Sequence, residues 1–200
     1  MRSIGVALLL FSLTPLAAFG QPSSPRSTPA VIEVPNVDLG PGTYLDRARR
    51  LLELHPALVR ASVTSLRPRA PERSADRTQR FVQVIDGQPV VGASVSVRFD
   101  RRGRARTVND ETRRVSTVSP AVLSADATSA RALKHVAGPA GSSVKGPSHA
   151  PARPVYVVVG EEARAAFEIH VATGRALEVV KVLVDAVDGE VVSVSPAVLQ

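Results

Sequence analysis

The chain has 200 residues, no cysteine, and a formal net charge of +7 from 25 Lys and Arg against 18 Asp and Glu. The lack of cysteine excludes disulfides, thiolate catalysis, cysteine-ligated zinc and a lipoprotein anchor. The arginines are spread along the chain, and aromatic residues make up only 4% of it, so few platforms exist for stacking bases. We therefore expect a solvated basic surface that does not bind nucleic acid but can attract an acidic partner protein.

The first twenty residues have the pattern of a secretory signal peptide. Arg2 supplies the positive start, residues 4–16 form a short apolar stretch, and Ala18 and Gly20 are small residues of the kind that signal peptidase recognises. We expect cleavage after Gly20, which predicts a secreted or periplasmic protein with no membrane association after cleavage. The alternative is an uncleaved anchor, but Pro15 interrupts the stretch and its length is short for a bilayer span.

Residues 21–42 are rich in proline, serine and threonine and show no sustained period, which predicts a disordered arm. Thr43 then offers an N-cap to a helix over residues 44–55. Apolar residues recur on one face of this helix, and arginines occupy the other faces. The helix should end at His55, because the residue before Pro56 is pushed out of the helical region.

From Phe81 the hydrophobic period changes to two. Residues 81–85 form a predicted strand, and Asp86-Gly87 is a tight-turn signal leading into a second strand. That strand alternates apolar with polar positions, as expected where one face is buried and one is wet. Gly92 suggests a bulge or a close backbone approach. After a turn at 101–103, residues 105–108 can return as a third strand. The apolar positions are Ala93, Val95, Val97 and Phe99, and the polar ones are Ser94, Ser96, Arg98 and Asp100.

A second helix is predicted over residues 125–136, capped by Ser124, with Ala127, Ala130 and Leu133 on its inner face. A Gly-, Pro- and Ser-rich break follows. Beyond it the short spacings favour an antiparallel meander over parallel crossovers. Its four predicted strands are 155–159, 165–171, 177–184 and 190–194, with turns at Gly160-Glu161, Thr173-Gly174 and Asp188-Gly189.

These elements predict an α+β fold of antiparallel sheets with one or two short helices packed on one face. We divide the chain into a signal peptide (1–20), the arm (21–42), a first module (43–137), a Gly/Pro linker (138–153) and a β-meander module (154–200).

No arrangement of residues in the sequence points to catalysis. There is no His-Glu-x-x-His, no Gly-x-Ser-x-Gly around Ser94 and no phosphate-binding glycine loop. The histidines have no partner at the spacing of metal ligands, and Asp185, Asp188 and Glu190 lack the further positions of a calcium loop. We predict no enzyme activity, no metal and no cofactor. The four histidines, expected to be surface or capping residues, are His55, His135, His149 and His170.

Two segments carry a resemblance to a known family. One contains Gly87, Pro89, Val90 and Gly92 between valine-rich strands. The other contains Val-Asp-Ala and then Gly-Glu-Val, from Val184 to Val191. The first resembles the fungalysin/thermolysin propeptide (FTP) domain, and the second resembles a PepSY-like module. In the second segment, the signature residues are Asp185, Gly189 and Glu190, and in both segments we interpret the signature residues as structural turn residues.

The resemblance covers about residues 45–194 in the order found in the pro-region of secreted thermolysin-type zinc metalloproteases, without the catalytic domain. It implies a non-catalytic protein that binds such a protease, in cis or in trans, as a chaperone-like or inhibitory module. The segment 193–200 and any free edge strand are candidates to enter a substrate cleft. Two alternatives stay open: an N-terminal remnant of a longer metalloprotease precursor, or an extracellular binding module for another partner.

Overall fold

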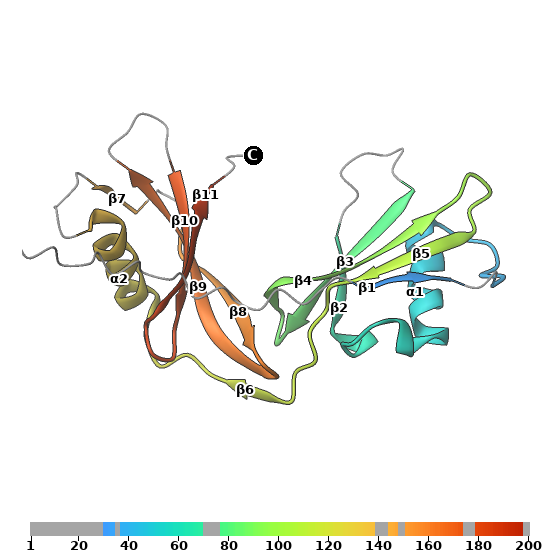
Figure 1. Cartoon of the computed structure of the whole chain (residues 1–200), viewed down its shortest axis with the longest axis horizontal. Helices are drawn as coiled ribbons and strands as arrows, with labels where there is room; N and C mark the ends of the chain where they lie inside the picture. Colours follow the sequence, from blue (N-terminus) through green and yellow to red (C-terminus); the bar gives the residue numbers. More distant parts are fainter. Residues whose placement is uncertain are drawn as a thin grey trace, which may run out of the picture.

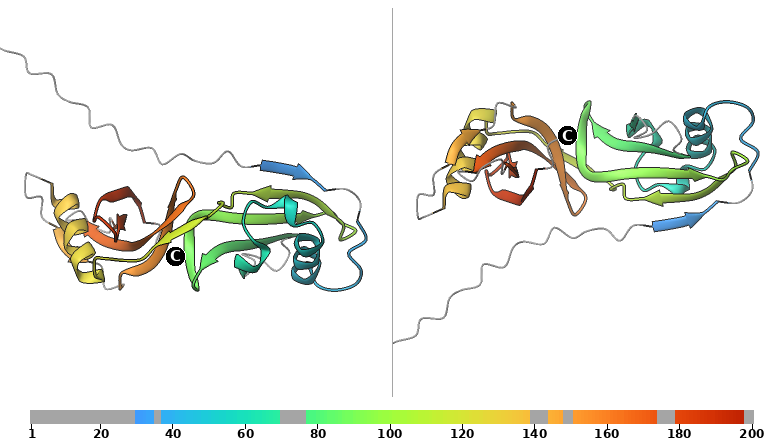
Figure 2. Two further views of the ribbon diagram at one scale, coloured as in Figure 1. Left: turned by 90° about the horizontal axis from the view of Figure 1, so that it is seen from below. Right: turned by 90° about the horizontal axis from the view of Figure 1, so that it is seen from above.

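The structure, a computed structural model, describes residues 30–34, 37–69, 77–138, 144–147, 151–173 and 179–197. The predicted signal peptide, its cleavage after Gly20 and residues 21–29 of the arm lie outside the described residues. So do His149, Gly174 and residues 198–200. The described part is α+β and mostly β, with two α-helices on a mixed sheet. The two helices lie toward opposite ends of an elongated molecule (Figures 1 and 2).

The first half is an antiparallel sheet in the order β2-β3-β4-β5-β1, with helix α1 and two short 3-10 turns on one face. Its core lies between α1 and the inward positions of the strands. The bounds are β1 Ala30–Glu33, α1 Tyr44–Leu54, η1 Pro56–Leu58, η2 Val63–Ser65, β2 Leu66–Arg69, β3 Thr78–Ile85, β4 Gln88–Phe99 and β5 Ala105–Asp110.

Helix α1 begins and ends where the sequence predicts. The Thr43 hydroxyl accepts from the Asp46 backbone N–H at 3.2 Å, and the Asp46 carboxylate accepts from the Thr43 N–H at 3.0 Å, forming a capping box. The Thr43 hydroxyl also donates to the Asp46 carboxylate at 2.7 Å, and this hydrogen bond, followed by the one from the Thr43 N–H, lowers the pKa of Asp46. Leu51 and Leu52 are fully buried against the sheet, and His55 is the C-cap residue before Pro56.

The predicted hairpin between β3 and β4 is confirmed. Asp86 and Gly87 have φ of 50° and 80°, the conformation of a two-residue type I′ turn, which asparagine, aspartate and glycine tolerate best. Gly92 also has positive φ, 68°, beside a register irregularity in the β3–β4 pairing, so the predicted bulge is confirmed. The suggested close backbone approach is wrong, because a Cβ added at Gly92 would meet nothing within 4 Å.

The prediction of a disordered arm over 21–42 is wrong for part of that range. Ala30–Glu33 forms β1, which pairs antiparallel with β5, and Leu39 is buried in the core. The composition of the arm concealed this strand, because Ala30-Val31-Ile32 is an isolated apolar run among prolines. Its strand conformation depends on β5 offering a free edge, which is a tertiary effect that local patterning does not report.

The second half is built around the predicted meander β8-β9-β10-β11, in which every neighbouring pair is antiparallel. Two further strands pair with β9: β7 antiparallel, and β6 parallel. The bounds are β6 Thr117–Ser119, α2 Ala125–Ala137, β7 Val144–Pro147, β8 Arg153–Val159, β9 Glu162–Thr173, β10 Val179–Asp185 and β11 Val191–Pro196.

Helix α2 is capped by Ser124, whose hydroxyl accepts from the Ala127 N–H at 3.2 Å. Its predicted inner face is partly wrong: Ala130 is exposed, and Thr128 and Ala132 are buried instead. The helix is alanine-rich, so its hydrophobic period is weak and its orientation is set by packing on β9 and β10. The predicted first module (43–137) includes this helix, whereas its packing partners β9 and β10 lie in the second; the module boundaries remain predictions.

The two halves meet where the start of β4 pairs with β8 in parallel, with Val90 opposite Tyr156. This contact joins the strands into one sheet with the path β1-β5-β4-β8-β9-β10-β11. The prediction of purely antiparallel sheets is therefore wrong at two places, β4–β8 and β6–β9. Short turns between strands predict antiparallel neighbours along the chain, but they carry no information about pairings between distant segments.

Candidate functional site

The two segments that carry the family resemblance, about 100 residues apart in the sequence, come together at the junction of the halves. Val90 of the first and Ala186 of the second belong to one hydrophobic cluster, which also contains Tyr156 and Ala165. The backbone N–H of Ala186 donates to the Ala165 carbonyl at 2.8 Å. The Ala186 carbonyl accepts from Val122 and Leu123, so the segment before α2 is anchored at the same point.

The β3–β4 turn lies close to Tyr156 of the second half. The pKa of Tyr156 is raised, first by burial and then by the negative charge of Asp86. Tyr156 is 7% exposed, and its strand neighbour Val155 is buried on the opposite face. Pro89 pairs with Val84 directly after the turn, so Gly87, Pro89, Val90 and Gly92 form and bend the hairpin end that touches the second half.

The second signature segment is held by a charged network. The Asp185 carboxylate is buried, accepts from the Val187 N–H at 2.7 Å, and forms an ion pair with Arg164 at 3.1 Å. The other end of the Arg164 guanidinium contacts Asp188 at 2.5 Å. The Asp188 hydrogen bond, followed by the charges of Asp185 and Asp188, raises the pKa of Arg164; burial opposes it. The Asp188 pKa is lowered, most by the Glu190 backbone N–H.

The predicted Asp188-Gly189 turn is longer than a two-residue hairpin loop. Residues 186–188 form the turn, Gly189 follows with φ of 79°, and β11 begins at Val191. Arg131 of α2 reaches across and donates to the carbonyls of Asp188 and Gly189 at 3.2 and 3.4 Å. Glu190 contributes its backbone: its carbonyl accepts from Asp185 and its N–H donates to Asp188. Arg164 and Arg131, which the sequence analysis did not single out, thus hold this turn.

The three described histidines lie on three different elements. His55 caps α1, His135 is exposed on α2, and His170 on β9 lies 3.7 Å from the Glu168 carboxylate. Among the described residues there is no group of His, Cys, Asp or Glu able to hold a metal ion. Ser94 donates to Glu111 at 2.9 Å and faces no histidine in the described structure. None of the helices in the described ranges has the length and apolarity needed to cross a membrane.

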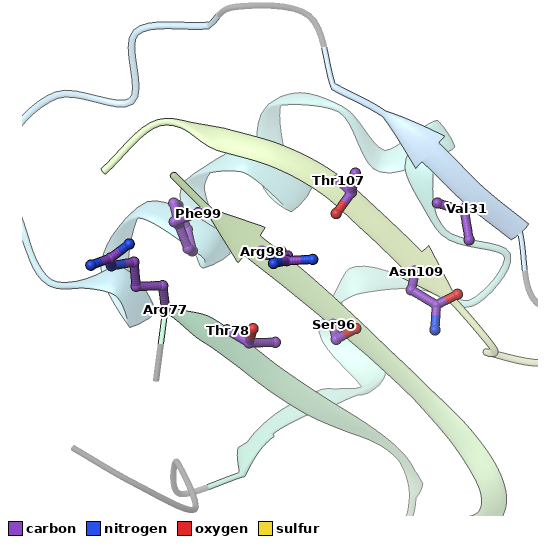
Figure 3. A pocket seen from close by; sticks show the side chains of 8 residues that line it. All are labelled: Val31, Arg77, Thr78, Ser96, Arg98, Phe99, Thr107 and Asn109. Carbon is purple, nitrogen blue, oxygen red and sulfur yellow. The ribbon is translucent and has the colours of Figure 1, made fainter. Parts of the chain in front are cut away.

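A polar hollow of about 560 Å³ lies on the face of the first sheet opposite α1 (Figure 3). Its floor is made by the polar positions of three adjacent strands, and Val31 of β1 and Phe99 border it. We call it the basic pocket and define it by Arg77, Thr78, Ser96, Arg98, Thr107 and Asn109.

The positive charges of the basic pocket are not neutralised by neighbours in the described structure. Arg98 lies on the central strand with Thr78 and Thr107 as its register partners, and neither Arg98 nor Arg77 forms an ion pair with a described residue. The side-chain oxygen of Asn109 is buried and has no hydrogen-bond donor there. The alternation of β4 predicts Arg98 on the wet face, but nothing in the local pattern predicts that Arg98 lies beside Arg77 and Asn109.

Comparisons with known proteins find a likeness to solved structures alone. No family model matches the sequence. No curated protein matches it. Among solved structures, one match is the Bacillus megaterium YpeB C-terminal domain, with 13% sequence identity and a TM-score of 0.40. The alignment covers 78% of this chain and 64% of that chain, less than two thirds of its length. At that TM-score the likeness carries no argument about the function of this protein.

Proposed function

We propose that this protein is a secreted or periplasmic, non-catalytic module that binds a thermolysin-type zinc metalloprotease and acts on it as a chaperone or inhibitor. The proposal rests on the resemblance of the two signature segments to FTP and PepSY-like modules. The packing of the two segments into one hydrophobic cluster supports it, because a combined pro-region would need both segments to form one structural unit.

The observation that carries the proposal furthest is the exposed edge strand β11. It follows the second signature turn, and within the described residues its strand partner is β10 alone. Ser193, Val194 and Pro196 are exposed. An edge strand offers unpaired backbone donors and acceptors, and an extended segment with small side chains can pair with the wall of a substrate cleft. The same contact would form whether the protease belongs to the same precursor or to a separate chain.

Two effects follow from one binding surface. A segment that occupies the cleft blocks substrates, which is inhibition. A partner that binds the native protease and not its unfolded chain stabilises the native state by mass action, which favours refolding.

The experiment is a titration of thermolysin-type metalloproteases with the purified protein, measuring peptidase activity and the yield of refolding from denaturant. We expect lower activity and a higher yield with at least one protease. The variant Val194→Glu on β11 should weaken both effects by about tenfold, because it places a charge on the paired strand. Val122→Glu, at a 73% exposed position outside any strand, is the matched control and should leave both unchanged. Unchanged activity and yield across a panel of such proteases would refute the proposal.

A further inference from the structure

We propose that the basic pocket on the first sheet is a docking site for an acidic polypeptide segment, bound through its Asp or Glu side chains. This inference concerns a different surface from β11 and does not depend on the partner being a protease. Its starting point is the arrangement of the pocket's residues in two rows across the sheet face.

The rows follow from the strand register. Thr78, Arg98 and Thr107 are successive partners on β3, β4 and β5, and Arg80, Ser96 and Asn109 form the next row. Because side chains of register partners point to the same face, the hydroxyls and the amide surround the Arg98 guanidinium (Figure 3). Arg77 directly precedes β3 and lines the same pocket.

The carboxylates that the structure describes near the pocket leave Arg77 and Arg98 unneutralised. Asp100 is engaged by Arg104 at 3.0 Å and Arg106 at 3.2 Å, and Glu111 accepts from Ser94. Glu33 is the register partner of Thr107 on β1, two strands away from Arg98. A central-strand arginine between two threonines is therefore free to take a carboxylate from outside, with hydroxyls positioned to complete the hydrogen bonds.

Charge complementarity selects the partner. The pocket is polar, and a smaller hollow of about 330 Å³ that includes Arg101 and Arg106 shares Arg77, Arg98 and Phe99 with it. The two adjoining hollows together form a basic surface that is larger than a single small anion would occupy. Phe99 is the one aromatic side chain that borders the pocket in the described structure, and it is 3% exposed, so bases would find no stacking surface. An acidic polypeptide, whose side chains present carboxylates at regular intervals, satisfies both conditions.

The test uses a synthetic peptide of alternating Glu and Thr and measures its dissociation constant with the purified protein. Arg98→Gln should weaken binding by about tenfold, because it removes a charge-assisted hydrogen bond to the ligand. Arg49→Gln removes the same charge from an exposed position on α1, across the sheet, and should change the constant less than about twofold. Equal losses in the two variants would show a general charge effect and overturn the proposal.

A second variant keeps the test independent of folding defects. Asn109→Asp places a carboxylate diagonally across from Arg98, where it can take the position of the ligand's carboxylate. We expect this nearly isosteric variant to lose peptide binding while its stability to urea is retained or raised. Undiminished peptide binding by a folded Asn109→Asp protein would contradict the proposal, as would tighter binding of a single-stranded DNA of equal charge.

Discussion

Val90 in β4 is the register partner of Tyr156 in β8, across the parallel pairing that joins the two halves of the sheet. Both residues lie in a cluster with Ala186, so both segments of the family resemblance contribute to this contact. The two segments therefore form a structural joint between the halves.

The joint predicts a stability effect. Val90 is 3% exposed and Val91, its neighbour, is 38% exposed. Val90→Ala should reduce the free energy of unfolding by about 2 kcal/mol, because it removes buried methyl groups and leaves a cavity. Val91→Ala is the matched control and should change it by less than about 0.5 kcal/mol. Urea unfolding of both variants checks this, and equal losses would refute a packed joint.

Two glycines with positive φ should respond differently to alanine. Gly92→Ala should cost about 1–2 kcal/mol, the cost of the left-handed backbone alone, because the added Cβ meets open space. Gly189→Ala should cost more, since the added Cβ displaces the Arg131 guanidinium and so removes its hydrogen bonds to the carbonyls of the turn.

The additional cost at Gly189 should vanish in an Arg131→Ala background, where the overlapping guanidinium is gone. Thermal or urea unfolding of the double-mutant cycle measures this coupling. Strictly additive effects of the two substitutions would contradict the assigned role of Arg131.

Asp100 should give the protein an acid-sensitive contribution to stability. Hydrogen bonds, led by the Arg104 backbone N–H, lower the pKa of Asp100 from 3.8 to about 2. Because the folded-state pKa is below the unfolded value, the contribution is fully present above about pH 4 and is lost as the pH falls through about 2.

The variant Asp100→Asn should thus be less stable than the original protein at neutral pH, and the difference should shrink as the pH is lowered toward 2. Glu53→Gln, at an exposed position on α1, serves as the control. Unfolding free energies of both proteins, measured from neutral pH down to about pH 2, test this prediction. A stability difference that grows on acidification would contradict it.

The N-cap of α1 offers a local test of the first module. Thr43→Ala removes the acceptor for the Asp46 N–H and should destabilise the protein by about 1 kcal/mol. Thr43→Ser retains the hydroxyl and should be close to neutral. A loss of similar size in the two variants, measured by urea unfolding, would argue against the capping box.

The sequence predicted local structure well where chemistry is local. Thr43 before an apolar helical face, Asp86-Gly87 between alternating strands, and the wet-face position of Arg98 each depend on near neighbours in the chain. What it could not predict depends on distant partners. β1 forms because β5 has a free edge, α2 turns toward β9 through Ala132, and the parallel pairing of Val90 with Tyr156 has no signal in either segment.

The candidate site shows the same division. The sequence separated the polar positions of β4 from its apolar ones, but the register that places Arg98 between Thr78 and Thr107 is a property of the assembled sheet. Likewise, Asp185 is recognisable in its motif, whereas its ion-pair partner Arg164 lies on another strand with no marking feature in the sequence.

The most direct test of the central claim is capture of a partner from the culture supernatant by the tagged protein, with identification by mass spectrometry and a peptidase assay before and after release. We expect capture of a secreted chain with a His-Glu-x-x-His motif, whose peptidase activity rises on release. Capture of no such chain, or of one whose activity is the same bound and released, would contradict it.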